Sequence, residues 1–167
     1  MEPIHQYFLG ERQAGLCAAL LGLGSLLFTL WLFRSVSPFR AMMIPLAIVG
    51  LLQLGVGIGL YVKTPAQVAG VEAGLSQPDP ITRTAAHRKE LTRMERVQAN
   101  FVLIKRVWIG LIALGLGLAL FGAPRSTLIG VGLGILIQAA VMLAFDVFAE
   151  ARGQTYFSFL QSTADKP

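Results

Sequence analysis

Four long stretches without a charged residue dominate this sequence of 167 residues. They cover residues 14–33, 41–62, 107–123 and 128–145. A helix of about twenty apolar residues crosses the hydrocarbon core of a bilayer. The four stretches are apolar on every face, whereas a surface helix of a soluble bundle keeps one polar face. The sequence therefore predicts an all-α, polytopic membrane protein with four transmembrane helices at these positions.

The spans are expected to form one domain, residues 1–167, built from two helical hairpins. Residues 64–106, between the second and third spans, are expected to form a further helical hairpin. Thr64, Pro65 and Gln67 follow the pattern of a capping box, which predicts that a new helix begins just after the second span. From Ile81 to Ile109 there is no proline or glycine, so one helix should run from the hairpin directly into the third span.

The distribution of lysine and arginine predicts the orientation. Eleven of the 14 basic residues fall at the termini and in the central segment, and three fall in the two short loops on the other side. Basic residues are enriched on the cytoplasmic side of membrane proteins. Both termini and the central hairpin are therefore predicted to be cytoplasmic, in the cell membrane or, in a bacterium, the inner membrane.

The two halves of the chain resemble each other. Residues 21–28 resemble residues 114–121 at a separation of 93, and Gln53 matches Gln138 at a separation of 85. One interpretation is a parallel repeat of the two hairpins, as in some transporters. The alternative is a chance resemblance between spans rich in glycine and leucine.

Two glutamines and two pairs of glycines interrupt the apolar spans. Gln53 and Gln138 lie near the middle of their spans, where a buried amide needs a partner. They are expected to bond to each other or to a backbone carbonyl; a role in a transport path is the alternative. The pairs Gly55/Gly59 and Gly130/Gly134 allow close helix packing, either within one molecule or in a homo-oligomer. Cys17 is expected to be a small packing residue.

A set of charged residues is predicted at the inner ends of the spans. Asp146 follows the last span, about 27 Å along the helix from Leu128. A charge near hydrocarbon is costly and is a candidate site. We expect Asp146 to pair with Arg12 or Arg106 instead, in a collar of charges at the level of the headgroups; a proton, substrate or catalytic site is the alternative. The collar comprises Glu11, Arg12, Lys63, Lys105, Arg106, Asp146 and Glu150.

The central segment carries an amphipathic pattern. Lys89, Arg93 and Arg96 share one helix face, and apolar residues from Met94 to Trp108 form a stripe on another. One interpretation is an arm lying on anionic lipid headgroups. The other is a hairpin that packs its stripe on residues 65–75 and leaves the basic face in water or free for a partner. The aromatic residues of the tail, including Tyr156, are expected to form an interfacial belt.

No motif of a membrane enzyme is present. The two histidines lie outside the spans, and no nucleotide-binding or metalloprotease motif occurs. No catalytic residue, cofactor or metal is therefore predicted. The favoured function is that of an accessory or assembly subunit, or a homo-oligomeric scaffold, acting through residues 64–106. A small transporter using Gln53 and Gln138 is the first alternative, and a membrane enzyme using Asp146 and Glu150 is the second. The expected partners are the bilayer, anionic headgroups, and a second copy or another membrane protein, but not nucleic acid.

Overall fold

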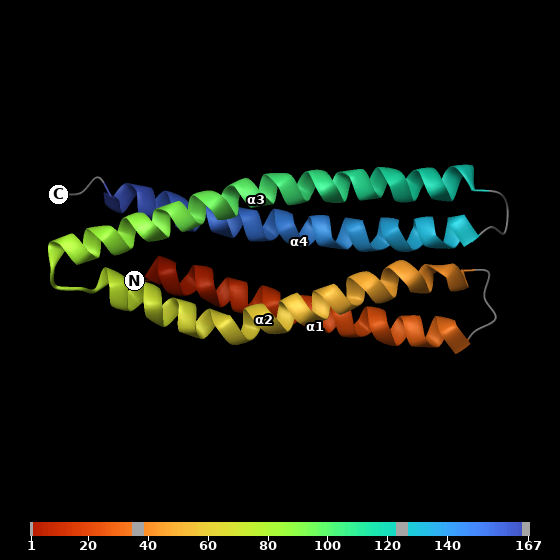
Figure 1. The fold of residues 1–167 in the computed structure, drawn as a ribbon, viewed down its shortest axis with the longest axis horizontal. Helices are drawn as coiled ribbons and strands as arrows, with labels where there is room; N and C mark the ends of the chain where they lie inside the picture. The colour runs from red at the N-terminus through yellow and green to blue at the C-terminus, as the bar shows by residue number, and fades with distance from the viewer. Residues whose placement is uncertain (1, 35–38, 123–126, 165–167) are drawn as a thin grey trace.

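The computed structural model describes residues 2–34, 39–122 and 127–164 and consists of helices. The elements are α1 (Glu2–Arg34), the short 3-10 helix η1 (Arg40–Met42), α2 (Met43–Leu75), α3 (Pro80–Phe121) and α4 (Thr127–Ala164). α1 pairs with α2, α3 pairs with α4, and the two hairpins lie side by side (Figure 1). Each of the four long helices is long and apolar enough to cross a membrane. The prediction of an all-helical chain with four candidate spans is confirmed.

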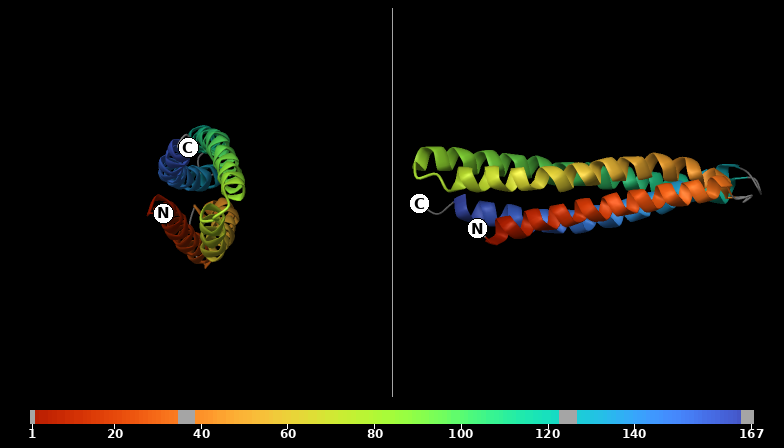
Figure 2. Two further views of the ribbon diagram at one scale, coloured as in Figure 1. Left: turned by 90° about the vertical axis from the view of Figure 1, so that its left-hand side faces the viewer. Right: turned by 90° about the horizontal axis from the view of Figure 1, so that it is seen from below.

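Each helix is longer than its apolar stretch. The helices have 33, 33, 42 and 38 residues, and 33 residues of α-helix span about 50 Å. The surplus gathers at one end of the molecule, where both chain termini and the turn between α2 and α3 lie (Figure 2). We call this the polar end; it comprises residues 2–13, 63–106 and 146–164.

α2 passes through the point where a new helix was predicted. It is continuous from Met43 to Leu75 with Pro65 inside it. Thr64 caps nothing: its hydroxyl donates to the carbonyl oxygen of Leu60, one turn back, at 2.6 Å. The side chain is buried, so packing holds this turn helical although Pro65 lacks an N–H. The prediction that a new helix begins at Thr64 is wrong, because the packing of Thr64 keeps α2 continuous despite the local capping pattern.

The turn into α3 follows its local signal. Asp79 is the N-cap of α3, and its carboxylate accepts hydrogen bonds from the backbone N–H groups of Ile81 and Thr82 at 3.4 and 2.9 Å. The Thr82 hydroxyl donates to the same carboxylate, and this bond, followed by the backbone bonds, favours the charged form and lowers the pKa of Asp79. Pro80 occupies the first turn, where its missing N–H costs nothing.

Glycines set the contact between the helices of each hairpin. A Cβ atom on Gly22 of α1 would lie 2.6 Å from the carbonyl oxygen of Gly50 in α2. Similarly, a Cβ atom on Gly115 of α3 would lie 2.7 Å from the carbonyl oxygen of Gly132 in α4. Position 115 lies 93 residues after 22, but 132 lies 82 residues after 50. The hairpins therefore share one crossing, but in a register that does not match Gln53 with Gln138.

One of the two predicted glycine pairs, Gly55/Gly59, does not lie at a contact between helices. A Cβ atom on Gly55 or Gly59 would meet nothing within 4 Å, and the contact with α1 is made by Gly57 instead. Gly130 and Gly134 do pack, against η1 and the first turn of α2. Cys17 is exposed on the outside of the bundle, so its predicted packing role is wrong.

The main buried core lies at the polar end. Tyr7 and Phe8 from α1, Met94 from α3, and Tyr156 and Leu160 from α4 are all at most 5% exposed. Val68, Val71 and Leu75 from α2 pack against them. The polar end is thus a small four-helix bundle that includes both terminal segments, not only residues 64–106. Tyr156 belongs to this core, so the prediction that it forms an interfacial belt is wrong.

The apolar segments, by contrast, keep most of their side chains on the outside. α1 and α3 are the most exposed, while α2 and α4 are more covered. The large exposed residues include Leu20, Trp31, Leu52, Val56 and Leu120. Outward-facing apolar side chains on long helices are what a lipid environment accommodates.

Candidate functional site

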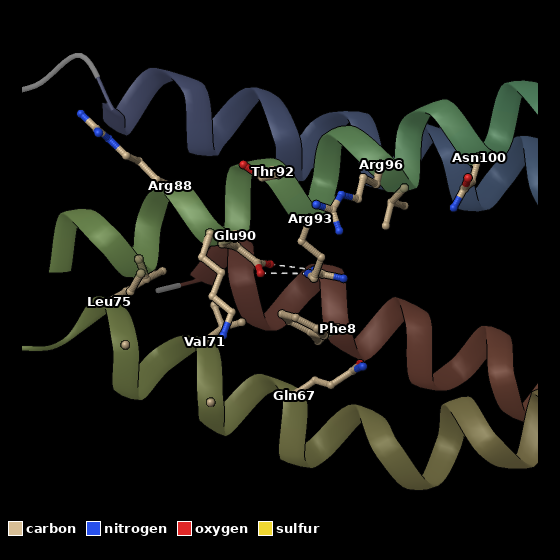
Figure 3. Close-up of a pocket in the computed structure, with 15 residues that line it drawn as sticks. Phe8, Gln67, Val71, Leu75, Arg88, Glu90, Thr92, Arg93, Arg96 and Asn100 are labelled. Atoms are coloured by element: carbon tan, nitrogen blue, oxygen red, sulfur yellow. Dashed lines mark hydrogen bonds and ion pairs between the residues drawn. The ribbon is translucent and has the colours of Figure 1, made fainter. Parts of the chain in front are cut away.

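A groove of about 960 Å³ separates α2 from α3 at the polar end. The two helices meet near the turn, where a Cβ atom on Gly74 would lie 3.0 Å from the Cβ of Ala86. From there they diverge (Figure 1), and Phe8 of α1 lies between them as part of the groove floor (Figure 3). The α2 wall is low because it presents Gly70 and Gly74.

The α3 wall of the groove is basic. Lys89, Arg93 and Arg96, which the sequence places on one helix face, all line it, together with Arg88. Lys89, Arg96 and Arg88 are exposed. Arg88 and Thr92 point away from α2 in Figure 3, toward the outer side of α3. The groove therefore has small and apolar groups on one side and cations on the other.

Arg93 differs from its neighbours because it is already paired. Its Nε and Nη2 donate to the two carboxylate oxygens of Glu90 at 2.9 and 2.7 Å (Figure 3). Its guanidinium also stands over the Phe8 ring, 5.6 Å from the centroid. Burial alone lowers the pKa of Arg93, but the hydrogen bonds and charge of Glu90 outweigh it and raise the pKa. Arg93 is a structural member of the wall rather than a free cation.

Glu90 connects the groove wall to the core. It is 6% exposed, and the Tyr156 hydroxyl donates to its Oε1 at 3.1 Å. The Tyr156 ring stacks on Tyr7 with centroids 4.5 Å apart, and the Tyr7 hydroxyl donates to Glu11 at 2.6 Å. Burial, followed by the neighbouring carboxylates, raises the pKa of both tyrosines. The Tyr156–Glu90 hydrogen bond thereby joins α4 to α3, and the stacked tyrosine rings join α4 to α1, in one network of hydrogen bonds and ring contacts.

Sequence reasoning did not identify this network. The signal was present at Glu90, which lies four residues before Met94 and so extends the apolar stripe backwards by one turn. A carboxylate on the buried face of a helix needs partners. Tyr156, which supplies one of these partners, lies far from Glu90 in the sequence, and Tyr7, on which its ring stacks, comes from the opposite end of the chain. The sequence alone therefore could not bring these residues together.

A second polar cluster lies within the apolar part of the bundle. Gln53 and Gln138 are 3% and 4% exposed, and Gln53 Nε2 donates to Gln138 Oε1 at 3.3 Å. Gln138 Nε2 donates to the Ser25 hydroxyl at 2.9 Å, and Gln53 Nε2 also contacts the Met142 sulfur at 3.0 Å. Within the described residues, Gln53 Oε1 has no hydrogen-bond donor. The structure thus brings the two glutamines together, with Ser25 as a third member.

The predicted charge collar is only partly assembled by the structure. Lys105 and Glu150 form an ion pair at 2.5 Å between α3 and α4. Asp146 has a different partner from those predicted: its Oδ2 accepts from the Trp108 indole N–H at 2.5 Å. Glu11 accepts from Tyr7, as described above, and Lys63 and Arg106 are exposed.

Arg12 belongs to the other hairpin. It donates to the Tyr61 hydroxyl at 3.0 Å and lies 4.5 Å over that ring. The collar residues therefore act as two separate local clamps, one within each hairpin. Among the described residues, no three His, Cys, Asp or Glu side chains gather where they could hold a metal ion. Comparison of the chain with protein-family models, curated proteins and solved structures found no match.

Proposed function

We propose that this chain is a non-catalytic integral membrane protein, an accessory or assembly subunit whose working surface is the helical hairpin of residues 64–106. In this proposal the polar end and both termini lie in the cytoplasm. The excess of basic residues at that end supports this orientation. The exposed apolar segments of all four helices support membrane insertion.

The lengths of the helices support the placement of the membrane. Gln53 lies 11 residues after the end of η1 at Met42 and 10 residues before Lys63, which is about 16 and 15 Å of helix. These distances are half of the roughly 30 Å hydrocarbon core. The glutamine pair then lies at the bilayer centre, and Lys63 lies at the cytoplasmic edge.

One observation carries the proposed function: the α2–α3 groove and the outer face of α3 present exposed cations on a well-buried core. A core that joins four helices holds this surface rigidly, and preorganised surfaces lose less entropy on binding. In the described part of the chain, several carboxylates, namely Glu11, Glu90, Asp146 and Glu150, are each bonded to a neighbouring side chain. Carboxylates held in this way fit a binding protein better than an enzyme.

The orientation is tested by cysteine labelling. In a Cys17→Ser background, Ser76→Cys at the turn should react with a membrane-impermeant maleimide only after permeabilisation, and Thr127→Cys should react in intact cells. Reaction of both cysteines from the same side would refute the four-span topology.

The accessory role is tested by quantitative mass spectrometry of the protein purified in mild detergent. We expect a protein partner at near-equal stoichiometry, lost from an Arg88→Glu/Thr92→Glu variant on the outer face of α3. Arg40→Glu/Thr127→Glu makes the same chemical changes at the other end of the molecule and should retain the partner. Recovery of no stoichiometric partner, or equal loss from both variants, would contradict the accessory role.

A second candidate function, a small transporter or channel, is favoured by the buried Gln53 oxygen, which has no hydrogen-bond donor in the described part of the chain. Proton leak across proteoliposomes that contain the protein, reported by a pH-sensitive dye, would be lowered by Gln53→Leu/Gln138→Leu if this cluster conducts. An enzyme using Asp146 and Glu150 has no comparable support, because both carboxylates are already bonded.

A further inference from the structure

We infer that the α2–α3 groove binds the headgroup of an anionic phospholipid, whose acyl chains extend along α2 and α3 into the membrane. The inference rests on the membrane placement proposed above and identifies the class of ligand for that surface.

The groove ends within about two helical turns of the apolar stretches of both helices. The contact between Gly74 and Ala86 fixes the two helices in an antiparallel register. From Ala86 to Asn100, the last groove residue on α3, is about 21 Å, and from Gly74 back to Val62, the last residue of the apolar stretch on α2, is about 18 Å. Phe101 then begins a run of four apolar residues on α3, which Lys105 and Arg106 separate from the apolar stretch at residues 107–123. The open end of the groove is therefore at headgroup depth.

The charge of the groove suits a phosphate group. Lys89 and Arg96 are two helical turns apart, both line the groove, and both are exposed. In the described part of the chain neither has an ion-pair partner, whereas the single groove carboxylate, Glu90, is neutralised by Arg93. Guanidinium and ammonium groups are the common ligands of phosphate in proteins.

Apolar surface continues from the groove toward the hydrocarbon. Leu60 lies two turns from Gln67 on the α2 face that lines the groove, and Ile104 lies two turns from Val97 on the α3 face. Each is 38% exposed. Toward the membrane, the cationic surface of the groove is thus followed by apolar surface. A molecule with an anionic head and an apolar tail matches this order.

Two other occupants fit less well. A second copy of this chain would bring basic surface onto basic surface, since the net charge is +5. An acidic helix of a partner protein would have to enter at a membrane surface whose negative potential repels it. An anionic lipid is already part of that surface.

The test is a titration of phosphatidylglycerol and phosphatidylcholine into the detergent-solubilised protein, with bound lipid counted by native mass spectrometry. Wild type should bind one phosphatidylglycerol in preference to phosphatidylcholine. Lys89→Gln/Arg96→Gln should weaken phosphatidylglycerol binding by roughly thirty-fold, from two lost cations near the membrane surface. Arg83→Gln/Arg106→Gln removes two exposed cations of α3 that do not line the groove and should bind as wild type does.

A steric variant tests the same site without changing its charge. A Cβ atom on Gly70 would meet nothing within 4 Å, so Gly70→Leu fits the fold and fills the groove. It should abolish the preference for phosphatidylglycerol. Ala73→Leu, on an exposed position of α2 outside the groove lining, should not.

Three results would overturn the inference. The first is wild-type phosphatidylglycerol binding by Gly70→Leu or by Lys89→Gln/Arg96→Gln. The second is displacement of the lipid by millimolar inorganic phosphate, which would identify a site for a free anion. The third is a co-purified protein that is lost from Gly70→Leu while lipid binding is unchanged. Failure of the cysteine-labelling test would instead refute the proposed function.

Discussion

Replacement of Gln138 by leucine is expected to destabilise the protein more than replacement of Gln53, although the two amides bond to each other. Gln138 is the centre of the cluster, because it accepts from Gln53 and donates to Ser25. Gln53 makes one long bond and one sulfur contact, and its oxygen has no donor among the described residues. Its burial is therefore already poorly compensated in the native protein.

The magnitudes follow from this asymmetry. Gln138→Leu leaves the Gln53 amide and the Ser25 hydroxyl without their best partners, which should cost about 1–2 kcal/mol. Gln53→Leu removes a group that lacks one partner and leaves the Gln138–Ser25 bond in place, so its cost should be about 0–1 kcal/mol. The double variant removes both ends of the bond and should cost less than Gln138→Leu alone.

The free energy of unfolding can be measured in mixed micelles by titrating the mole fraction of denaturing detergent and following tryptophan fluorescence. The four proteins form a double-mutant cycle whose interaction energy should be about 1 kcal/mol. Equal single costs that add in the double variant would refute both the bond and its asymmetry.

Three further predictions concern packing, pH and the rim carboxylate. Gly57→Leu should cost about 1–3 kcal/mol, because its Cβ atom would lie 2.5 Å from α1 backbone atoms, whereas Gly55→Leu meets nothing and should be neutral in the same unfolding titration. Burial raises the pKa of Tyr7 and Tyr156 above the ordinary tyrosine value of about 10, so the unfolded state loses these protons first as pH rises. Their contribution to stability is complete below about pH 10 and should fall above it. A melting temperature independent of pH between about 9 and 11 would contradict this. Asp146→Asn keeps an oxygen acceptor for the indole, so it should cost only about 1 kcal/mol in thermal unfolding; a loss above about 3 kcal/mol would point to a charge partner after all.

The number and type of helices could be predicted because hydrophobicity is a local property that needs no partner. The same is true of the Asp79 cap, where the bonds run to residues two and three positions away. The glutamine contact was also among the expectations, since a buried amide in an apolar span has few partners from which to choose.

Features that depend on how helices rotate against one another were not predictable. The sequence offers Gly55, Gly57 and Gly59 on α2, and only the orientation toward α1 selects Gly57. Charge complementarity suggested an arginine for Asp146, but the neighbouring helix presents the indole of Trp108. Tyr156 has the composition of an interfacial aromatic, and only the presence of the N-terminal segment beside it makes it a core residue.

The glycine crossings within each hairpin also bear on how the chain is made. Most of the helix–helix contacts lie within α1–α2 and within α3–α4, and the covalent link between these halves is the short turn at residues 76–79. In the proposed membrane setting, each hairpin can therefore form as soon as its own two helices have been synthesised. The halves then meet through the Gln53–Gln138 pair, through the aromatic core, and through Gly130 and Gly134 against η1 and the start of α2. Residues 1–77 and 78–167, expressed as separate polypeptides, would retain every one of these contacts. The two hairpins should therefore be able to assemble as a heterodimer without the covalent link.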